Sequence, residues 1–123
     1  MNTNDLLISE QPIVVLPSIA KAIGFNEAIV LQRLHELLNK PDTMVEQEGY
    51  NWVRSTYEQW REHFPFLSII TIKRIFYRLE KAGLIITAQF DKGHWDQTKY
   101  YRIDYPALGD LSNFLFYDEG GKG

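Results

Sequence analysis

Residues 55–83 read STYEQWREHFPFLSIITIKRIFYRLEKAG, and this stretch decides the fold of the chain. It predicts two helices, over residues 56–63 and 69–82, on either side of Pro65. Because proline disfavours helical geometry at the residue before it, the first helix has to end there. Two helices joined by a tight turn are typical of a helix-turn-helix, so this motif is expected.

Both predicted helices begin at capping signals. Ser55 and Glu58 have the S-x-x-E spacing of a capping box, in which two backbone N–H groups are satisfied reciprocally. Ser68 is the predicted N-cap of the second helix. Gly83 is expected to end that helix in the left-handed conformation, with Leu84 as the apolar contact.

A β-hairpin is predicted directly after the second helix. Residues 84–90 and 98–104 are rich in β-forming residues, and residues 91–97 join them through Asp-Lys-Gly turn chemistry. The predicted fold class is therefore α+β: a winged helix-turn-helix with a helical core and a C-terminal β-hairpin wing. Such a unit places its second helix in the major groove of DNA.

Two further helices are predicted before the quoted stretch. Pro17 can open a short helix, and Gly24 is expected to end it in the left-handed conformation. Asn26 is the predicted N-cap of the longer helix that follows. Phe25 and Val30 have the spacing of a hydrophobic staple around that cap.

The connection from these helices to the quoted stretch is predicted to be mostly irregular. Residues 40–50 are acidic and turn-rich and indicate a loop, whereas residues 51–54 indicate a short strand. Aromatic side chains follow at spacings typical of buried positions, which favours a core beneath the turn over a platform for stacking bases. These residues are Trp52, Tyr57, Trp60, Phe64 and Phe66.

The second helix of the motif has an apolar and a basic side. The predicted buried stripe consists of Ile69, Ile72, Phe76 and Leu79, with Ile75 at its border. No acidic residue interrupts the basic side before Glu80, whereas a helix that is merely solvated usually mixes charges of both signs. This pattern favours an anionic partner, and an inert basic surface is the alternative.

The charge of the chain is segregated along its length. The net charge is −3, but residues 68–102 hold seven basic and three acidic side chains. Residues 1–67 hold five basic and nine acidic side chains, and residues 103–123 hold one and four. A separate basic patch is typical of a protein that binds an anionic polymer, and chance clustering on a solvated surface is the alternative.

The basic residues predict a division of roles on DNA. Arg74 and Arg78 can fork onto the N7 and O6 atoms of guanine, and Thr71 can touch a thymine methyl group or a phosphate. Ser68 and the first N–H groups of its helix favour a phosphate. The complete set of predicted DNA-binding residues is Ser68, Thr71, Lys73, Arg74, Tyr77, Arg78, Lys92, His94 and Lys99. Trp95 either contacts DNA or packs onto Tyr100.

Several classes of function lack support in the sequence. The chain has no cysteine, no signal peptide, no long apolar run and no nucleotide-binding glycine loop, so we expect a cytoplasmic protein. His35, His63 and His94 lie on different predicted elements without metal-ligand spacing. We therefore expect no metal, no cofactor, no catalytic residues, no membrane contact and no small-molecule substrate.

Three strings carry a resemblance to a known family: IVVLPSIAKAIGFNEAIVLQRLHELLNK, NWVRSTYEQWREHFPFLSIITIKRIFYRLEKAGLI and TKYYRIDYPAL. Together they resemble the N-terminal winged-helix region of phage and plasmid replication initiators and replisome organisers of Gram-positive bacteria, over about residues 12–108. The resemblance implies the fold and a DNA-binding helix from Ser68 to Arg78. It implies no enzymatic activity.

These observations predict a sequence-specific binder of double-stranded DNA that acts in replication initiation. The alternatives are a small transcriptional regulator of the same fold and a protein–protein adaptor module. A homodimer on a repeated site and contacts with replication proteins are the candidate partnerships. We expect a flexible N-terminus (residues 1–11), a DNA-binding domain (residues 12–108), and an apolar tail with a frayed end as a candidate interaction segment (residues 109–123).

Overall fold

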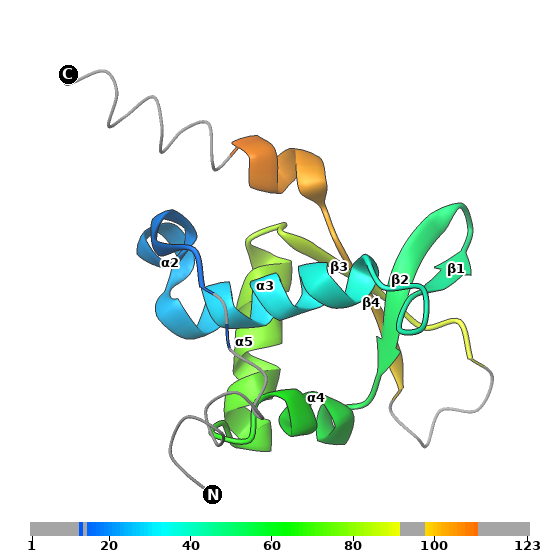
Figure 1. Cartoon of the computed structure of the whole chain (residues 1–123), viewed down its shortest axis with the longest axis horizontal. Coiled ribbons are helices and arrows are strands. Elements are labelled where there is room, and N and C mark those ends of the chain that lie inside the picture. The colour runs from blue at the N-terminus through cyan, green and yellow to red at the C-terminus, as the bar shows by residue number, and fades with distance from the viewer. Residues whose placement is uncertain (1–12, 14, 92–97, 111–123) are drawn as a thin grey trace, which may run out of the picture.

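The computed structural model describes residue 13, residues 15–91 and residues 98–110, and these residues form an α+β fold (Figure 1). Helices pack against one face of a four-stranded antiparallel sheet. The helices are α2 (Pro17–Ile23), α3 (Phe25–Leu38), α4 (Tyr57–His63) and α5 (Ile69–Lys81). The strands are β1 (Val45–Gln47), β2 (Tyr50–Ser55), β3 (Ile85–Ala88) and β4 (Lys99–Ile103). Residues 105–110 are also helical.

The sheet has the strand order β1-β2-β4-β3, and every neighbouring pair is antiparallel. The predicted hairpin of β3 and β4 is confirmed, with Ile85 opposite Ile103. Strand β4 also pairs with β2, where Val53 lies opposite Tyr101. The hairpin is therefore joined to the strand that precedes α4, which connects it to the centre of the fold.

The prediction of a loop over residues 40–50 is wrong in part, because Val45–Gln47 form strand β1 and pair with β2. The two strands are joined by Glu48 and Gly49, which both have positive φ, at 53° and 81°. Two successive residues with positive φ are the mark of the tight turn that matches the twist of a hairpin. The Glu-Gly pair was the available signal, and the acidic composition around it hid the strand.

The core is centred on the indole of Trp60, which is fully buried. Its ring lies 5.0 Å from that of Phe76 on α5 and 5.4 Å from that of Tyr101 on β4, measured between centroids. Phe64 stacks on the same indole at 6.2 Å. The predicted core is confirmed for Trp52, Trp60 and Phe64, whereas Tyr57 is half-buried and Phe66 is exposed.

Both ends of α5 form as predicted. The Ser68 hydroxyl oxygen accepts a hydrogen bond from the Thr71 N–H at 3.1 Å. At the other end Gly83 has φ 76°, and the Leu84 N–H donates to the carbonyl of Leu79 at 3.0 Å. Together with the bond from Gly83 N–H to the Glu80 carbonyl, this is a Schellman motif.

The buried stripe of α5 is rotated slightly from its predicted position. Ile72, Ile75, Phe76 and Leu79 are buried, whereas Ile69 is only half-buried. Ile75 is therefore a core residue instead of a border residue. The reason is that α3 packs along α5 on the side of Ile75, and the amphipathic pattern of a single helix does not encode which neighbour covers its edge.

The predicted N-cap of α3, Asn26, is wrong by two residues. Helix α3 begins at Phe25 with Gly24 as its N-cap, and Phe25 is exposed, so it forms no staple with Val30. Gly24 has φ 107° and ψ 153°, which is an extended mirror-image conformation instead of the predicted left-handed one.

The capping box of α4 is formed by Thr56 and Gln59 instead of Ser55 and Glu58. The Thr56 N–H donates to the side chain of Gln59 at 2.9 Å, and the Gln59 N–H donates to Thr56 Oγ1 at 3.1 Å. Ser55 is unavailable as a cap because it is the last residue of β2 and lies opposite Lys99.

Several predictions concern residues that the structure does not describe. These are the N-terminal segment 1–11, the hairpin loop with Lys92, His94 and Trp95, and the tail beyond residue 110. In the described part of the chain, no helix combines the length and apolar character that crossing a membrane requires.

Replacing the central indole should strongly destabilise the fold. We expect Trp60→Ala to lower the free energy of unfolding by about 3–5 kcal/mol, because it leaves a cavity between α4, α5 and β4. Phe66→Ala is the matched control at an exposed aromatic of the adjacent turn, and it should cost less than about 1 kcal/mol. Urea unfolding followed by circular dichroism measures both, and equal losses would contradict the central role of Trp60.

His63 at the end of α4 gives the fold a dependence on pH. Its pKa is lowered, mainly because burial beside the rings of Trp60 and Phe64 disfavours the charged imidazolium. The positive charges of Arg33 and Lys40 lower the pKa further, and the carboxylate of Glu62 opposes them. The folded chain therefore binds this proton less readily than the unfolded chain.

The free energy of unfolding should decrease as the pH falls below about 6.5, the ordinary pKa of histidine, because the unfolded state takes up the proton first. The decrease should level off once the pH lies below the lowered pKa of folded His63. In His63→Gln this part of the decrease should be absent. Urea unfolding at a series of pH values between about 7.5 and 5.5 measures the effect, and identical pH profiles for both proteins would contradict it.

Candidate functional site

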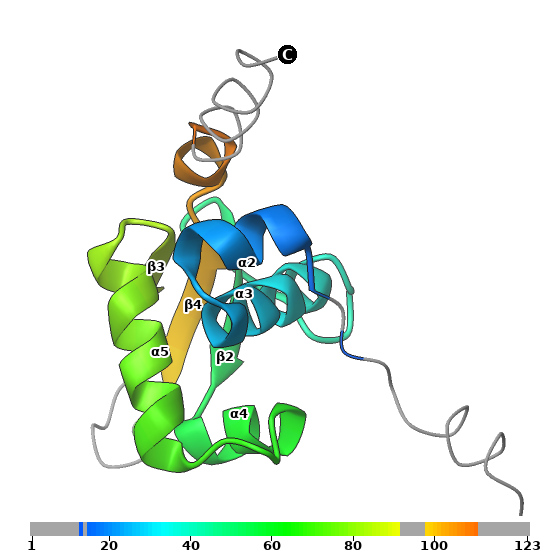
Figure 2. The ribbon, with the colours of Figure 1, turned by 90° about the vertical axis from the view of Figure 1, so that its left-hand side faces the viewer.

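Helix α5 lies along one side of the molecule, and its outer side is covered by no other described helix or strand (Figure 2). Four exposed residues at helical spacing follow the middle of this side: Ile70, Arg74, Tyr77 and Lys81. We call these four residues the outer face of α5. Ile70 is 70% exposed and Tyr77 is 59% exposed, and the Lys81 ammonium lies 5.7 Å from the centre of the Tyr77 ring.

The outer face differs from the predicted contact edge in two ways. The sequence placed Thr71, Arg74 and Arg78 on one line, but Thr71 is half-buried and Arg78 lies at the side that borders α3. Ile70 was absent from the predicted site, although an isoleucine outside the apolar stripe was a signal that could have found it. A large apolar side chain in water is costly unless a partner covers it.

A buried carboxylate from α3 meets α5 beside the outer face. Glu27 Oε2 lies 3.4 Å from Nη1 of Arg78, and the Arg78 side chain remains 65% exposed, whereas residue Glu27 is only 7% exposed. The other oxygen, Oε1, occupies the place where a Cβ atom on Gly24 would stand. A side chain at position 24 would therefore require the carboxylate to move.

Two lysines converge on the opposite side of α5. Lys73 on α5 and Lys99 on β4 place their ammonium groups 5.3 and 5.4 Å from the centre of the Tyr57 ring. Lys99 also donates to the Tyr57 hydroxyl at 3.3 Å. We call Lys73, Lys99 and Tyr57 the cationic flank. The structure thus brings together two predicted site residues from distant parts of the sequence, and it adds Tyr57, which the sequence assigned to the core.

The single acidic residue of α5, Glu80, is engaged with the hairpin. Glu80 accepts a hydrogen bond from the Thr87 hydroxyl on β3. Of the cations Lys73, Arg74, Arg78 and Lys81, only Arg78 forms an ion pair within the described residues. The basic side of α5 therefore keeps most of its positive charge.

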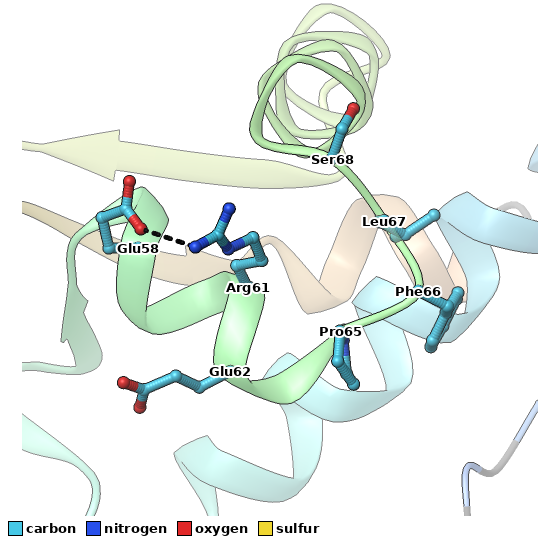
Figure 3. Close-up of a pocket in the computed structure, with 7 residues that line it drawn as sticks. All are labelled: Glu58, Arg61, Glu62, Pro65, Phe66, Leu67 and Ser68. Carbon is cyan, nitrogen blue, oxygen red and sulfur yellow. Dashed lines mark ion pairs between the residues drawn. The ribbon is translucent and has the colours of Figure 1, made fainter.

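The turn between α4 and α5 forms an open hollow of about 450 Å³ beside Ser68 (Figure 3). Glu58 and Arg61 lie side by side in it, with 3.4 Å between the carboxylate and the guanidinium. The Ser68 hydroxyl donates to Thr71 Oγ1 at 3.0 Å and caps the helix as well. The Ser68 hydroxyl is thus engaged within the protein, and the hollow is also lined by the carboxylates of Glu58 and Glu62.

The base of the β3–β4 hairpin is held by a charged cluster. Asp91 accepts hydrogen bonds from the Tyr100 hydroxyl at 2.7 Å and from Arg54 Nε at 2.8 Å. These two bonds lower the pKa of Asp91, with Tyr100 making the larger contribution. Asp91 is therefore fixed to strands β2 and β4 through Arg54 and Tyr100.

An apolar groove of about 280 Å³ opens on another part of the surface, between α2, α3 and the helical residues 105–110. His35 Nδ1 and the Tyr105 hydroxyl are hydrogen-bonded at its rim, 2.8 Å apart.

Among the described residues, no group of three or more histidine, aspartate or glutamate side chains could hold a metal ion. Comparisons with protein-family models, with curated proteins and with solved structures found no significant match.

The position of the Glu27 carboxylate should make substitution of Gly24 more destabilising than substitution of Gly83. Both have positive φ, but an added Cβ meets nothing within 4 Å at Gly83, whereas at Gly24 it meets the carboxylate. We expect Gly83→Ala to lower the free energy of unfolding by about 1–2 kcal/mol through backbone strain alone. Gly24→Ala should cost more, because the buried carboxylate must also move. Urea unfolding measures both, and an equal or smaller cost at Gly24 would contradict this geometry.

Proposed function

We propose that the chain is a winged helix-turn-helix domain that binds double-stranded DNA without catalysis. In this proposal α4, the turn and α5 form the helix-turn-helix, and the β3–β4 hairpin is the wing. The order of these elements and their packing around Trp60 support it. Helix α5 enters the major groove in this proposal, because it is the second helix of the motif and its outer side is accessible.

The observation that carries the proposal is the composition of the outer face of α5. Arginine and lysine side chains alternate there with Ile70 and Tyr77, which are too exposed for a core role. Guanidinium groups can fork onto guanine, and an apolar side chain can contact the methyl group of thymine. Ile70, in the first turn of α5, and Tyr77 thus add two large exposed side chains to a face that otherwise carries positive charge.

The cationic flank supplies the contacts that are independent of sequence. Lys73 and Lys99 hold two positive charges beside the ring of Tyr57, and Lys99 also donates to its hydroxyl, at the point where α5 meets the hairpin. A DNA backbone that leaves the major groove beside α5 would place a phosphate near this position. We therefore assign phosphate binding to Lys73 and Lys99, and we assign base contacts to the outer face together with Arg78.

The resemblance to replication initiators makes marking of an origin repeat the proposed role. A transcriptional regulator that occupies an operator would use the same contacts, and the target site distinguishes the two roles. The adaptor alternative predicts a different result, because a chain that only holds a protein partner should not select any DNA sequence. Selection of bound sites from random duplex DNA by the purified protein tests the replication, transcription and adaptor alternatives together.

Removing arginines from α5 should weaken DNA binding. We expect Arg74→Ala and Arg78→Ala each to weaken binding to the selected duplex about tenfold or more, because each removes a candidate base contact. Lys40→Ala removes one positive charge from an exposed residue after α3 and is the matched control. Fluorescence anisotropy at low salt measures the affinities. Undiminished binding by the double arginine variant would contradict the proposed interface.

Salt dependence tests the flank separately. If about 5–6 phosphates are neutralised, the slope of log affinity against log salt concentration should be about −5. Lys73→Ala and Lys99→Ala should each make this slope shallower by about one and weaken binding to all duplexes alike. An unchanged slope in both variants would remove the phosphate contacts from the flank.

A further inference from the structure

We propose that Glu27, seated on Gly24, is a positioning residue that fixes the Arg78 guanidinium for reading one base pair. This inference rests on the proposed DNA-binding function and concerns the specificity of the same site. It assigns a role in recognition to a residue of α3, which lies outside the helix that enters the groove.

The Glu27 carboxylate is buried, which is unusual for a charged side chain. Glu27 is 7% exposed, and it lies in the first turn of α3, where the helix dipole favours a negative charge. Its Oε1 atom occupies the space that a side chain at Gly24 would fill. The carboxylate is therefore almost completely enclosed by protein, against the backbone of Gly24.

The contact between Glu27 and Arg78 involves one oxygen and one nitrogen atom. Glu27 Oε2 is 3.4 Å from Nη1 of Arg78, which is longer than a strong charge-assisted hydrogen bond of about 2.7–2.9 Å. The contact engages one of the amino groups of the guanidinium, and 65% of the Arg78 side chain stays exposed. The guanidinium is thus engaged at one amino group, while most of the side chain remains accessible.

The negative charge of Glu27 also affects binding to DNA in this proposal. A carboxylate beside the interface repels DNA phosphates, so it lowers affinity that does not depend on sequence. Its pairing with Arg78 also reduces the positive charge that a simple phosphate contact would use, which favours a different role for this arginine. The pairing is expected if Arg78 must keep one orientation, because bidentate recognition of guanine depends on the angle of the fork.

The test compares sequence discrimination with overall affinity. The selected duplex, its single-base-pair variants and a duplex without the site are titrated with the wild type, Glu27→Gln, Arg78→Ala and the double variant. We expect Glu27→Gln to reduce discrimination about tenfold at one base pair. Affinity for the duplex without the site should stay equal or increase. In the Arg78→Ala background, Glu27→Gln should have no further effect on discrimination.

Two additional variants separate positioning from a general effect on the fold. Glu36→Gln is the matched control on the same helix, where the carboxylate pairs with Arg33 at 3.3 Å, and it should leave discrimination unchanged. Arg78→Lys keeps the charge at an exposed position and loses the fork, so it should lose discrimination at the same base pair as Glu27→Gln. This variant tests the inference even where Glu27→Gln is poorly folded.

The outcomes are distinguishable. If the wild type selects no site from random DNA, the proposed function is wrong and this inference falls with it. If the wild type selects a site but Glu27→Gln weakens binding to every duplex equally, only the inference is overturned. Discrimination that survives in Arg78→Lys, or that Glu27→Gln reduces equally without Arg78, would also overturn it.

Discussion

The burial of the Trp60 indole is the constraint on which the rest of the structure depends. The indole belongs to the short helix α4, and its ring neighbours belong to α5 and β4. A seven-residue helix has little stability of its own, so α4 is held in place mainly by this tertiary contact. Because Phe76 and Tyr101 also contact each other, at 4.8 Å between ring centres, three elements are fixed by one aromatic cluster.

This cluster determines which side of α5 is accessible. Phe76 can meet Trp60 and Tyr101 only if its side of the helix turns inward, and the opposite side then carries Ile70, Arg74 and Tyr77 outward. The same cluster holds β4 close to α5, which brings Lys99 to the ring of Tyr57 beside Lys73. The positions of the outer face and of the cationic flank are therefore both consequences of core packing.

Local signals in the sequence were sufficient for much of the fold. The ends of α5 were predictable because Ser68 and Gly83 act within one helical turn, through bonds to nearby backbone groups. The β3–β4 hairpin was predictable from its alternating, β-rich pattern. The capping box was misplaced because Ser55 and Thr56 both carry hydroxyls, and only the pairing of Ser55 within the sheet excludes it.

The candidate site was less predictable than the fold, since its details depend on contacts between distant residues. The sequence placed Lys73, Arg74 and Arg78 on the basic side of α5, because helical spacing alone determines that arrangement. It could not show that Glu27, 51 residues earlier, reaches Arg78, or that Tyr57 joins Lys73 and Lys99. Strand β1 was missed for a different reason, because the acidic composition around Glu48 and Gly49 hid the turn that pairs it with β2.

The arrangement of carboxylates explains how a chain of net charge −3 can present a positive surface. Asp42, Glu46 and Glu48 lie in or beside the β1–β2 hairpin, which projects on the other side of the molecule from α5 (Figure 1). Charges that are separated by more than about 10 Å are largely screened from each other at physiological salt. In the described part of the chain, none of these three carboxylates forms an ion pair with a cation of α5, so they do not neutralise its positive charge directly. Glu27 is different, because it is buried beside α5 in the first turn of α3, where both the helix dipole and the Arg78 guanidinium favour its negative charge.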